Sequence, residues 1–311
     1  MIVLMEQDRK KLITAYVGII SVVLIWGVVP SIKKMIIANK ISASLFSTVT
    51  ALMAALVLLL INIKNLKHLR KEYFKIAVPS GACLGIAALA QALAYNFNAS
   101  PTNQAFLENL SCIVVPIILF FTVKKKPTVL TVLSAVLCLI SSMVLSGFFG
   151  DKLTFNAADI LNAFAGIMYG VNIAITGTYA KKFIASLYVM IQLFVKTVLS
   201  LVMTVMFNYI CIGSSPIDAI VFDFDISLLL ALIGLGVVSN AVCWTIRTSS
   251  MKYISPNAVS VIMPFSSAVT GLFAIIIGQD QFTLTLLIGG ILGLAASYMS
   301  ASSDIAERKR K

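Results

Sequence analysis

The chain has 311 residues, of which 59% are hydrophobic and only 12% are charged, and its net charge is +12. Soluble globular proteins carry about 25% charged residues, so this composition excludes a soluble protein with one apolar segment. The basic residues lie between the apolar runs, which indicates a membrane protein and argues against a nucleic-acid partner.

Apolar runs of about 20 residues recur along the whole chain, and each could cross roughly 30 Å of hydrocarbon as a helix. The runs are unbroken, whereas the strands of a membrane barrel alternate in polarity, so helices are predicted. We therefore predict an all-α integral membrane protein with ten transmembrane helices. The predicted spans are Leu12–Ile32, Ser42–Ile61, Lys75–Ala94, Thr102–Val123, Thr128–Phe149, Ala157–Tyr179, Ile184–Tyr209, Ile226–Thr248, Asn257–Ile277 and Phe282–Ser302.

The basic residues are distributed unevenly between the two sides of this predicted bundle. If the N-terminus is cytoplasmic, 18 lysines and arginines fall on the cytoplasmic side, and only Lys33, Lys34, Lys40 and Lys152 fall opposite. The positive-inside rule then predicts a multi-pass protein of the cell (plasma) membrane with both termini in the cytoplasm. The first run lacks a small-residue cleavage site, so we expect it to be a membrane helix and not a signal peptide.

Two segments of the chain share the same order of residue types. "SGACLGIAALAQALAYNFNASPTNQAFLENL" (80–110) and "IGLGVVSNAVCWTIRTSSMKYISPNAVSVIM" (233–263) both pass from a small-residue helix through Ser-Pro into the next span. A gap-free alignment places Gly81 opposite Gly234 and Glu108 opposite Val261. We predict two five-helix repeats, 1–150 and 151–311. Because five is odd, the repeats must be inverted, as in alternating-access transporters.

Other classes of function find little support in the residues. The five cysteines are scattered and the single histidine, His68, lies in a predicted loop, so no metal site or cofactor is expected. The chain has no GxxxxGK[ST] phosphate-binding loop for ATP-driven transport. The alternatives from other functional classes are an integral-membrane enzyme and an assembly protein. Of these classes and transport, we expect transport, and we expect that the chain is not an enzyme.

Several motifs resemble those of the EamA family in the drug/metabolite transporter superfamily. They are "LIWGVVPSIKK" in the first span, "ALAYNFNASPTNQAFLENL" at the third-to-fourth, "WTIRTSSMKYISPNAVSVIMPFSSAVTGLFAIIIGQDQFT" at the eighth-to-ninth and "GGILGLAASYMS" in the tenth. In the last part of the third motif, Asp280 stands where the family more usually has glutamate. The resemblance implies ten helices, an inverted repeat and secondary transport, commonly export of amino acids or related metabolites.

Polar side chains inside the spans are the candidates for substrate binding or coupling, because a polar group facing lipid is costly. Glu108 and Lys196 are the two ionisable candidates, and Arg247 is expected to extend to the cytoplasmic headgroups. Aromatic and amide residues add candidates in spans one, three, six and eight, which the resemblance places around a central cavity. These are Trp26, Gln91, Tyr95, Tyr169, Asn172, Asn240 and Trp244.

The residues leave two roles open for Glu108: it takes up a proton as the cavity closes, or it binds a substrate ammonium group. The expected function is a secondary transporter that exports amino acids or related compounds, and the alternative is an importer of a cationic nutrient such as choline. Expected partners are a small-molecule substrate, membrane lipid and protons as a candidate coupling ion. We expect a monomer.

Overall fold

The computed structural model describes residues 2–37, 41–96, 107–124, 126–145, 157–207, 225–278 and 282–309. In these ranges all regular structure is helical. Eight segments are long and apolar enough to cross a membrane, and α5 and α6 are two shorter apolar helices. The chain is therefore an all-α, multi-pass membrane protein.

The helices follow the predicted spans closely. The first half contains α1 (Ile2–Ile37), α2 (Ala43–Ile61), η1 (Ile63–His68), α3 (Lys71–Asn96), α5 (Ser111–Val123) and α6 (Val129–Leu145). The second half contains α7 (Ala157–Tyr179), η2 (Ala180–Lys182), α8 (Ala185–Phe207), α9 (Ile226–Ile233), η5 (Gly234–Val242), α10 (Cys243–Ser250), α11 (Pro256–Ile262), η6 (Met263–Phe265), α12 (Ser266–Ile276) and α13 (Leu284–Lys309).

The fourth predicted span is the main difference. It was expected to be one helix from Thr102, whereas α5 begins at Ser111, and residues 101–106 lie outside the described part of the chain. Glu108 therefore precedes α5 instead of lying inside it.

Two of the spans change helix type along their length. The eighth consists of α9, the π-helical segment η5 and α10, and the Asn240 side chain donates to the carbonyl oxygen of Leu235 within η5. The ninth changes to the short 3₁₀ segment η6 at Pro264, which cannot donate a backbone hydrogen bond. Such interruptions in membrane helices are often found near functional sites.

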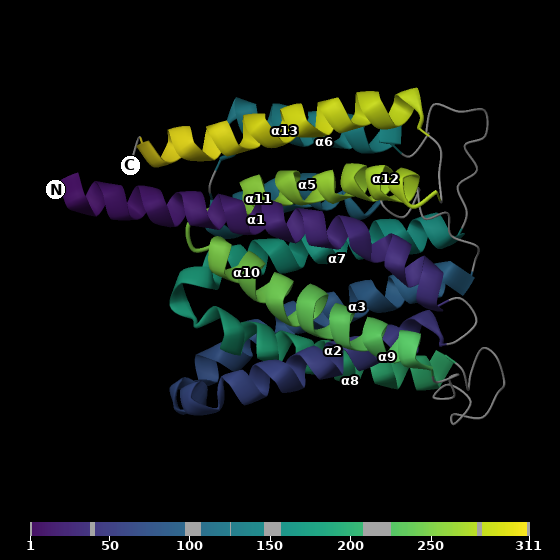
Figure 1. Ribbon diagram of the computed structural model, residues 1–311. Coiled ribbons are helices and arrows are strands. Elements are labelled where there is room, and N and C mark those ends of the chain that lie inside the picture. The colour runs from purple at the N-terminus through teal and green to yellow at the C-terminus, as the bar shows by residue number, and fades with distance from the viewer. Residues whose placement is uncertain are drawn as a thin grey trace.

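The helices lie side by side in one bundle, with both chain ends at the same end of it (Figure 1). α13 packs on α6, α3 packs on α7 and α8, and α1 packs on α12 and α10. Ile13, Val17, Ile20 and Leu24 form an exposed apolar stripe on α1. Their spacing of three and four residues puts them on one helix face, as expected for contact with lipid.

Close helix contacts occur at glycines, and one such contact appears twice. A methyl group at Gly27 in α1 would lie 2.5 Å from Cβ of Val269 in α12. A methyl group at Gly170 in α7 would lie 2.7 Å from Cβ of Val114 in α5. Glycine thus permits α1 to approach α12 in the same manner as α7 approaches α5.

A second contact is also repeated. A methyl group at Gly81 in α3 would lie 2.8 Å from Cα of Gln192 in α8 and 3.0 Å from Cβ of Val195. At Gly236 in η5 it would lie 3.6 Å from Cα of Thr50 in α2 and 3.3 Å from Cβ of Met53. The η5–α2 contact therefore reproduces the α3–α8 contact with slightly more space.

Candidate functional site

A buried polar cluster joins α3, α7 and α8 around Ser80. The Asn172 side chain donates to the Ser80 carbonyl oxygen at 3.0 Å and to Ser80 Oγ at 2.9 Å. The Gln192 amide donates to the same Oγ at 2.7 Å, and Thr176 lies 3.3 Å from it. All four side chains are buried, so these hydrogen bonds hold the three helices together where apolar contacts alone would be less specific.

Arg247 extends this cluster from α10. Its Nη2 donates to Asn172 Oδ1 at 3.0 Å, and its guanidinium carbon lies 4.4 Å from the centre of the Trp244 ring. The side chain is only 3% exposed, so the expectation that Arg247 reaches the headgroups was wrong. Its position on the packed face of α10, toward α7, keeps it inside the bundle.

The charge of Arg247 is incompletely compensated by its neighbours. Nε is buried and makes no hydrogen bond within the described part of the chain. Among those residues Arg247 forms no ion pair either, and its direct contacts include the hydrogen bond to Asn172 and the stacking on Trp244. A buried charge without a counter-ion is expensive. Arg247 is thus a buried cation whose Nε–H group has no acceptor among the described residues.

The tryptophans form an aromatic wall beside Arg247. The ring centres of Trp26 in α1 and Trp244 in α10 lie 5.1 Å apart, and Trp26 Nε1 donates to the Ser239 carbonyl oxygen at 3.1 Å. Trp26 also packs against three separate apolar clusters of the bundle. The predicted candidates Trp26, Asn172 and Trp244 are thus brought together.

A second polar group lies where α3 and α7 meet the residues before α5. The Tyr169 hydroxyl donates to Gln91 Oε1 at 3.0 Å, and Gln91 Nε2 donates to Glu108 Oε1. A methyl group at Gly166 would collide with the Leu107 carbonyl oxygen, so glycine permits this close approach. The three predicted candidates Gln91, Glu108 and Tyr169 therefore form one hydrogen-bonded chain.

The remaining predicted site residues are Lys196, Asn240 and Tyr95. Lys196 is buried, and its Cα lies 3.4 Å from where a methyl group at Gly85 would be, on the face of α8 that meets α3. Asn240 is half-buried and bonds within its own segment. The backbone of Tyr95 belongs to the end of α3, but its side chain lies outside the described part.

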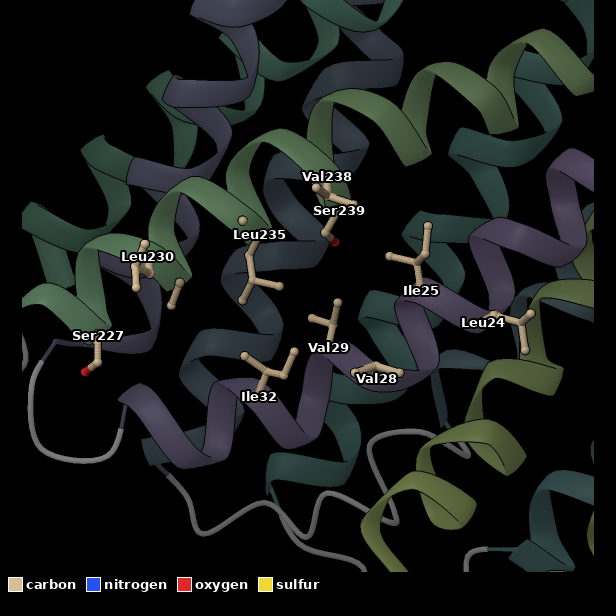
Figure 2. A pocket seen from close by; sticks show the side chains of 12 residues that line it. Leu24, Ile25, Val28, Val29, Ile32, Ser227, Leu230, Leu235, Val238 and Ser239 are labelled. Atoms are coloured by element: carbon tan, nitrogen blue, oxygen red, sulfur yellow. The ribbon is translucent and has the colours of Figure 1, made fainter. Parts of the chain in front are cut away.

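An apolar groove with a volume of about 700 Å³ lies between α1 and the α9–η5 segment (Figure 2). Its lining includes Leu24, Val29, Leu230, Leu235 and Val238, together with Ser227 and Ser239. Leu24, Leu230 and Val238 are also exposed, so the groove opens on the outer surface of the bundle. Ser239 connects it to the aromatic wall, because its carbonyl oxygen accepts from Trp26.

The described residues contain no group of three histidine, cysteine or acidic side chains placed to hold a metal ion. The side chains of the described site offer hydrogen bonds, charge and aromatic surface to a bound molecule.

Comparisons with known proteins agree with this architecture. Residues 160–302, from α7 to α13, match the EamA-like transporter family. The second half of the chain thus matches the EamA-like transporter family. This family is part of the drug/metabolite transporter superfamily, as the sequence motifs indicated. The comparison with curated proteins gives no match.

Among solved structures, one described only as "Crystal structure of protein" is similar to this EamA-like chain with a TM-score of 0.73. The identity is 13%, and the match covers 93% of this chain and 98% of the other. At such an identity the likeness concerns the fold alone.

The site residues predicted from the sequence left out four members of the buried cluster: Ser80, Thr176, Gln192 and Arg247. Serine and threonine are common in membrane helices, where they often bond their own backbone, so neither type marks a site by itself. For Arg247 the signal was its position in a span near aromatic residues. Whether it reached water depended on which face of α10 packs inward.

Proposed function

We propose that this chain is a secondary transporter that moves a small polar metabolite across the cell membrane by alternating access. Export of amino acids or related compounds is the leading candidate. The family match supports the general class of function. The hydrogen-bonded polar groups inside apolar helices support a polar substrate, because such groups in membrane proteins commonly serve a transported solute.

The proposed architecture is two inverted five-helix repeats, 1–150 and 151–311. The repeated contacts support it: Gly27 and Gly170 meet equivalent valines, and Gly81 and Gly236 approach equivalent helices. Both chain ends also lie at the same end of the bundle (Figure 1). With the excess of basic residues at that end, this supports cytoplasmic termini.

One difference between the halves carries the proposal of alternating access. Asn172 follows Gly170 by two residues as Val29 follows Gly27, and Ser80 precedes Gly81 as Leu235 precedes Gly236. The Asn172–Ser80 contact is closed by hydrogen bonds, whereas Val29 and Leu235 line the open groove. If the repeats are equivalent, one interface is closed while its counterpart is open, and exchanging the two arrangements would expose the centre alternately.

Glu108 supports a substrate with an amino group or a proton-coupled cycle. It is half-buried and hydrogen-bonded through Gln91 to Tyr169, so it has a defined position near the bundle interior. An ionised carboxylate there would attract an ammonium group, and a carboxyl group that titrates during closure would carry a proton. The aromatic pair of Trp26 and Trp244 supports the alternative, import of a cationic nutrient such as choline.

Flux in proteoliposomes tests the proposal. Vesicles containing the purified full chain are loaded separately with radiolabelled amino acids and with choline, and efflux and uptake are measured with and without a pH gradient. Protein-free vesicles provide the control. We expect at least one amino acid to leave faster than from the control vesicles. Uptake of choline alone would favour the alternative, and no flux from a folded sample would contradict a transporter.

A further inference from the structure

We propose that Arg247, with Asn172 and Trp244, forms a binding site for a carboxylate of the transported solute. This inference deepens the proposed transport function, because the carboxylate would belong to the substrate. The proposed site involves other hydrogen bonds than the Glu108 group that the sequence favoured. The two groups are nevertheless linked through α7, on which Tyr169 and Asn172 lie one turn apart.

The geometry of Arg247 carries the proposal. One face of the guanidinium lies against the Trp244 ring, and Nη2 is directed to Asn172, so the side chain is held in a fixed orientation. Nε remains buried without a hydrogen bond in the described part of the chain. A guanidinium fixed in this way can offer a pair of donors to the two oxygens of a carboxylate. The anion would supply the counter-charge and the acceptor that these neighbours lack.

The neighbouring side chains favour a carboxylate over a phosphate. Asn172, Ser80, Gln192 and Trp244 are all neutral, so the described site offers one positive charge. One charge balances a carboxylate, whereas a phosphate dianion would retain an uncompensated buried charge. The aromatic wall of Trp26 and Trp244 provides apolar surface for the body of the solute.

The groove gives this site a route to the surface of the bundle. Ser239 lines the groove and accepts the hydrogen bond from Trp26, whose ring packs on Trp244 beside Arg247. The Trp26 side chain therefore links the groove-lining residue Ser239 to the Trp244 ring that covers one face of the guanidinium. In the proposal, a change of the Trp26 rotamer brings the carboxylate site within reach of the groove.

Tryptophan fluorescence reports directly on the proposed site, because Trp26 and Trp244 are the only two tryptophans in the chain. The purified full chain in detergent is titrated with indole-free probes: L-leucine, isovalerate and, as analogues in which an amide replaces the carboxylate, L-leucinamide and isovaleramide. We expect the carboxylates to change the emission with saturation and the amides to bind at least about tenfold more weakly, since a charge-assisted hydrogen bond is lost. Inorganic phosphate should bind no better than the amides.

Three variants separate recognition from structure. Arg247→Gln should lose the preference for carboxylate over amide, and Arg247→Lys should keep part of it because the charge remains. Lys182→Gln removes a basic residue that lies over Tyr179, remote from the site, and should leave the preference unchanged. If Arg247→Gln fails to fold, Asn172→Ala, which frees a donor of Arg247, should alter the carboxylate affinity by several fold.

Two results would overturn the inference. One is a wild-type protein whose fluorescence responds equally to acids and amides or to neither. The other is a folded Arg247→Gln variant that keeps the full carboxylate preference. If the proteoliposomes show flux that does not depend on Arg247, the transporter proposal stands and the carboxylate site is wrong. If carboxylates bind through Arg247 but no solute is transported, the site stands and the transporter proposal is wrong.

Discussion

At the scale of single residues, Glu108 and Arg247 present opposite charges to different parts of the same interior. Glu108 is positioned by Gln91 from α3, and Arg247 is positioned by Asn172 from α7. An amino acid carries both complementary charges, so two charged sites that both contact α7 through hydrogen-bonded partners would select for a zwitterion over a simple acid or amine. This arrangement is the residue-level reason to place amino acids first among the substrates.

Glu108→Gln tests the role of the carboxylate. The amide can still accept from Gln91, and the site is half-buried, so we expect the thermal stability to change little. Amino-acid flux should fall at least about tenfold, because a charged hydrogen-bonding partner is lost. If exchange at equal concentrations persists but its pH dependence disappears, Glu108 couples protons. Normal flux with normal pH dependence would show that Glu108 has neither role.

Lys196→Met removes a buried charge and retains most of the apolar side chain. Lys196 is 9% exposed and lies on the face of α8 that meets α3 near Gly85. We expect flux to fall by at least about tenfold while the amount of folded protein is maintained, since buried ionisable residues in membrane helices usually serve function. Lys182→Met, at the exposed end of η2, is the matched control. An unchanged rate in the Lys196 variant would exclude a role in transport.

At the scale of helices, packing depends on where glycine allows two backbones to approach. We expect Gly81→Ala to destabilise the protein by about 1–3 kcal/mol, because its methyl group would lie 2.8 Å from backbone atoms of Gln192 that cannot move independently. Gly234→Ala is the control, since nothing lies within 4 Å of its methyl position. Thermal unfolding in detergent measures both. Equal melting temperatures for the two variants would contradict the close contact between α3 and α8.

Eight of the membrane-spanning helices could be predicted from the sequence because length and apolar content alone determine which segments can cross a bilayer, and the fourth and fifth predicted spans correspond to the shorter apolar helices α5 and α6. The pairing of the two halves could not be predicted as accurately. The gap-free alignment placed Gly81 opposite Gly234, but the repeated contact involves Gly236, two residues later. With so few identical residues, a shift of two positions leaves the alignment equally plausible. The same shift places Met263 instead of Val261 opposite Glu108, and the counterpart remains apolar.

The local helix type could not be predicted from the sequence either. Hydropathy does not distinguish α9 from the π-helical η5, because both are apolar. The hydrogen-bonded chain of Gln91, Glu108 and Tyr169 joins residues that are far apart in sequence, so only packing could reveal it. Individual polar residues could be identified from the sequence, because each is costly in an apolar span. The hydrogen-bond partner of each residue could not be identified in this way.

At the scale of the whole molecule, the proposed alternating access requires the two halves to exchange their arrangements. The closed contact between α3 and α7 is polar, with Ser80 bonded to Asn172 and near Thr176. Its counterpart between α1 and η5 is apolar, with Val29 and Leu235 lining the groove. Closing the groove would remove apolar surface from lipid or water, whereas opening the other interface would break buried hydrogen bonds. The free energy gained by burying apolar surface and the free energy lost by breaking hydrogen bonds oppose each other, which can keep the two states close in free energy.

Pairs of engineered cysteines test this exchange, in a background where the five native cysteines are replaced by alanine. The Ser80→Cys/Thr176→Cys pair should be cross-linked readily in the resting protein, because the two side chains are already in contact at 3.3 Å. Val29 and Leu235 line the groove, and cross-linking of the Val29→Cys/Leu235→Cys pair should increase when the groove closes. During turnover with substrate, we expect the yield of the first cross-link to fall and that of the second to rise.

Each cross-link should stop flux, and a reducing agent should restore it. If both yields rise or fall together under turnover, the two interfaces do not alternate, and a transport mechanism based on exchange between the halves would have to be abandoned.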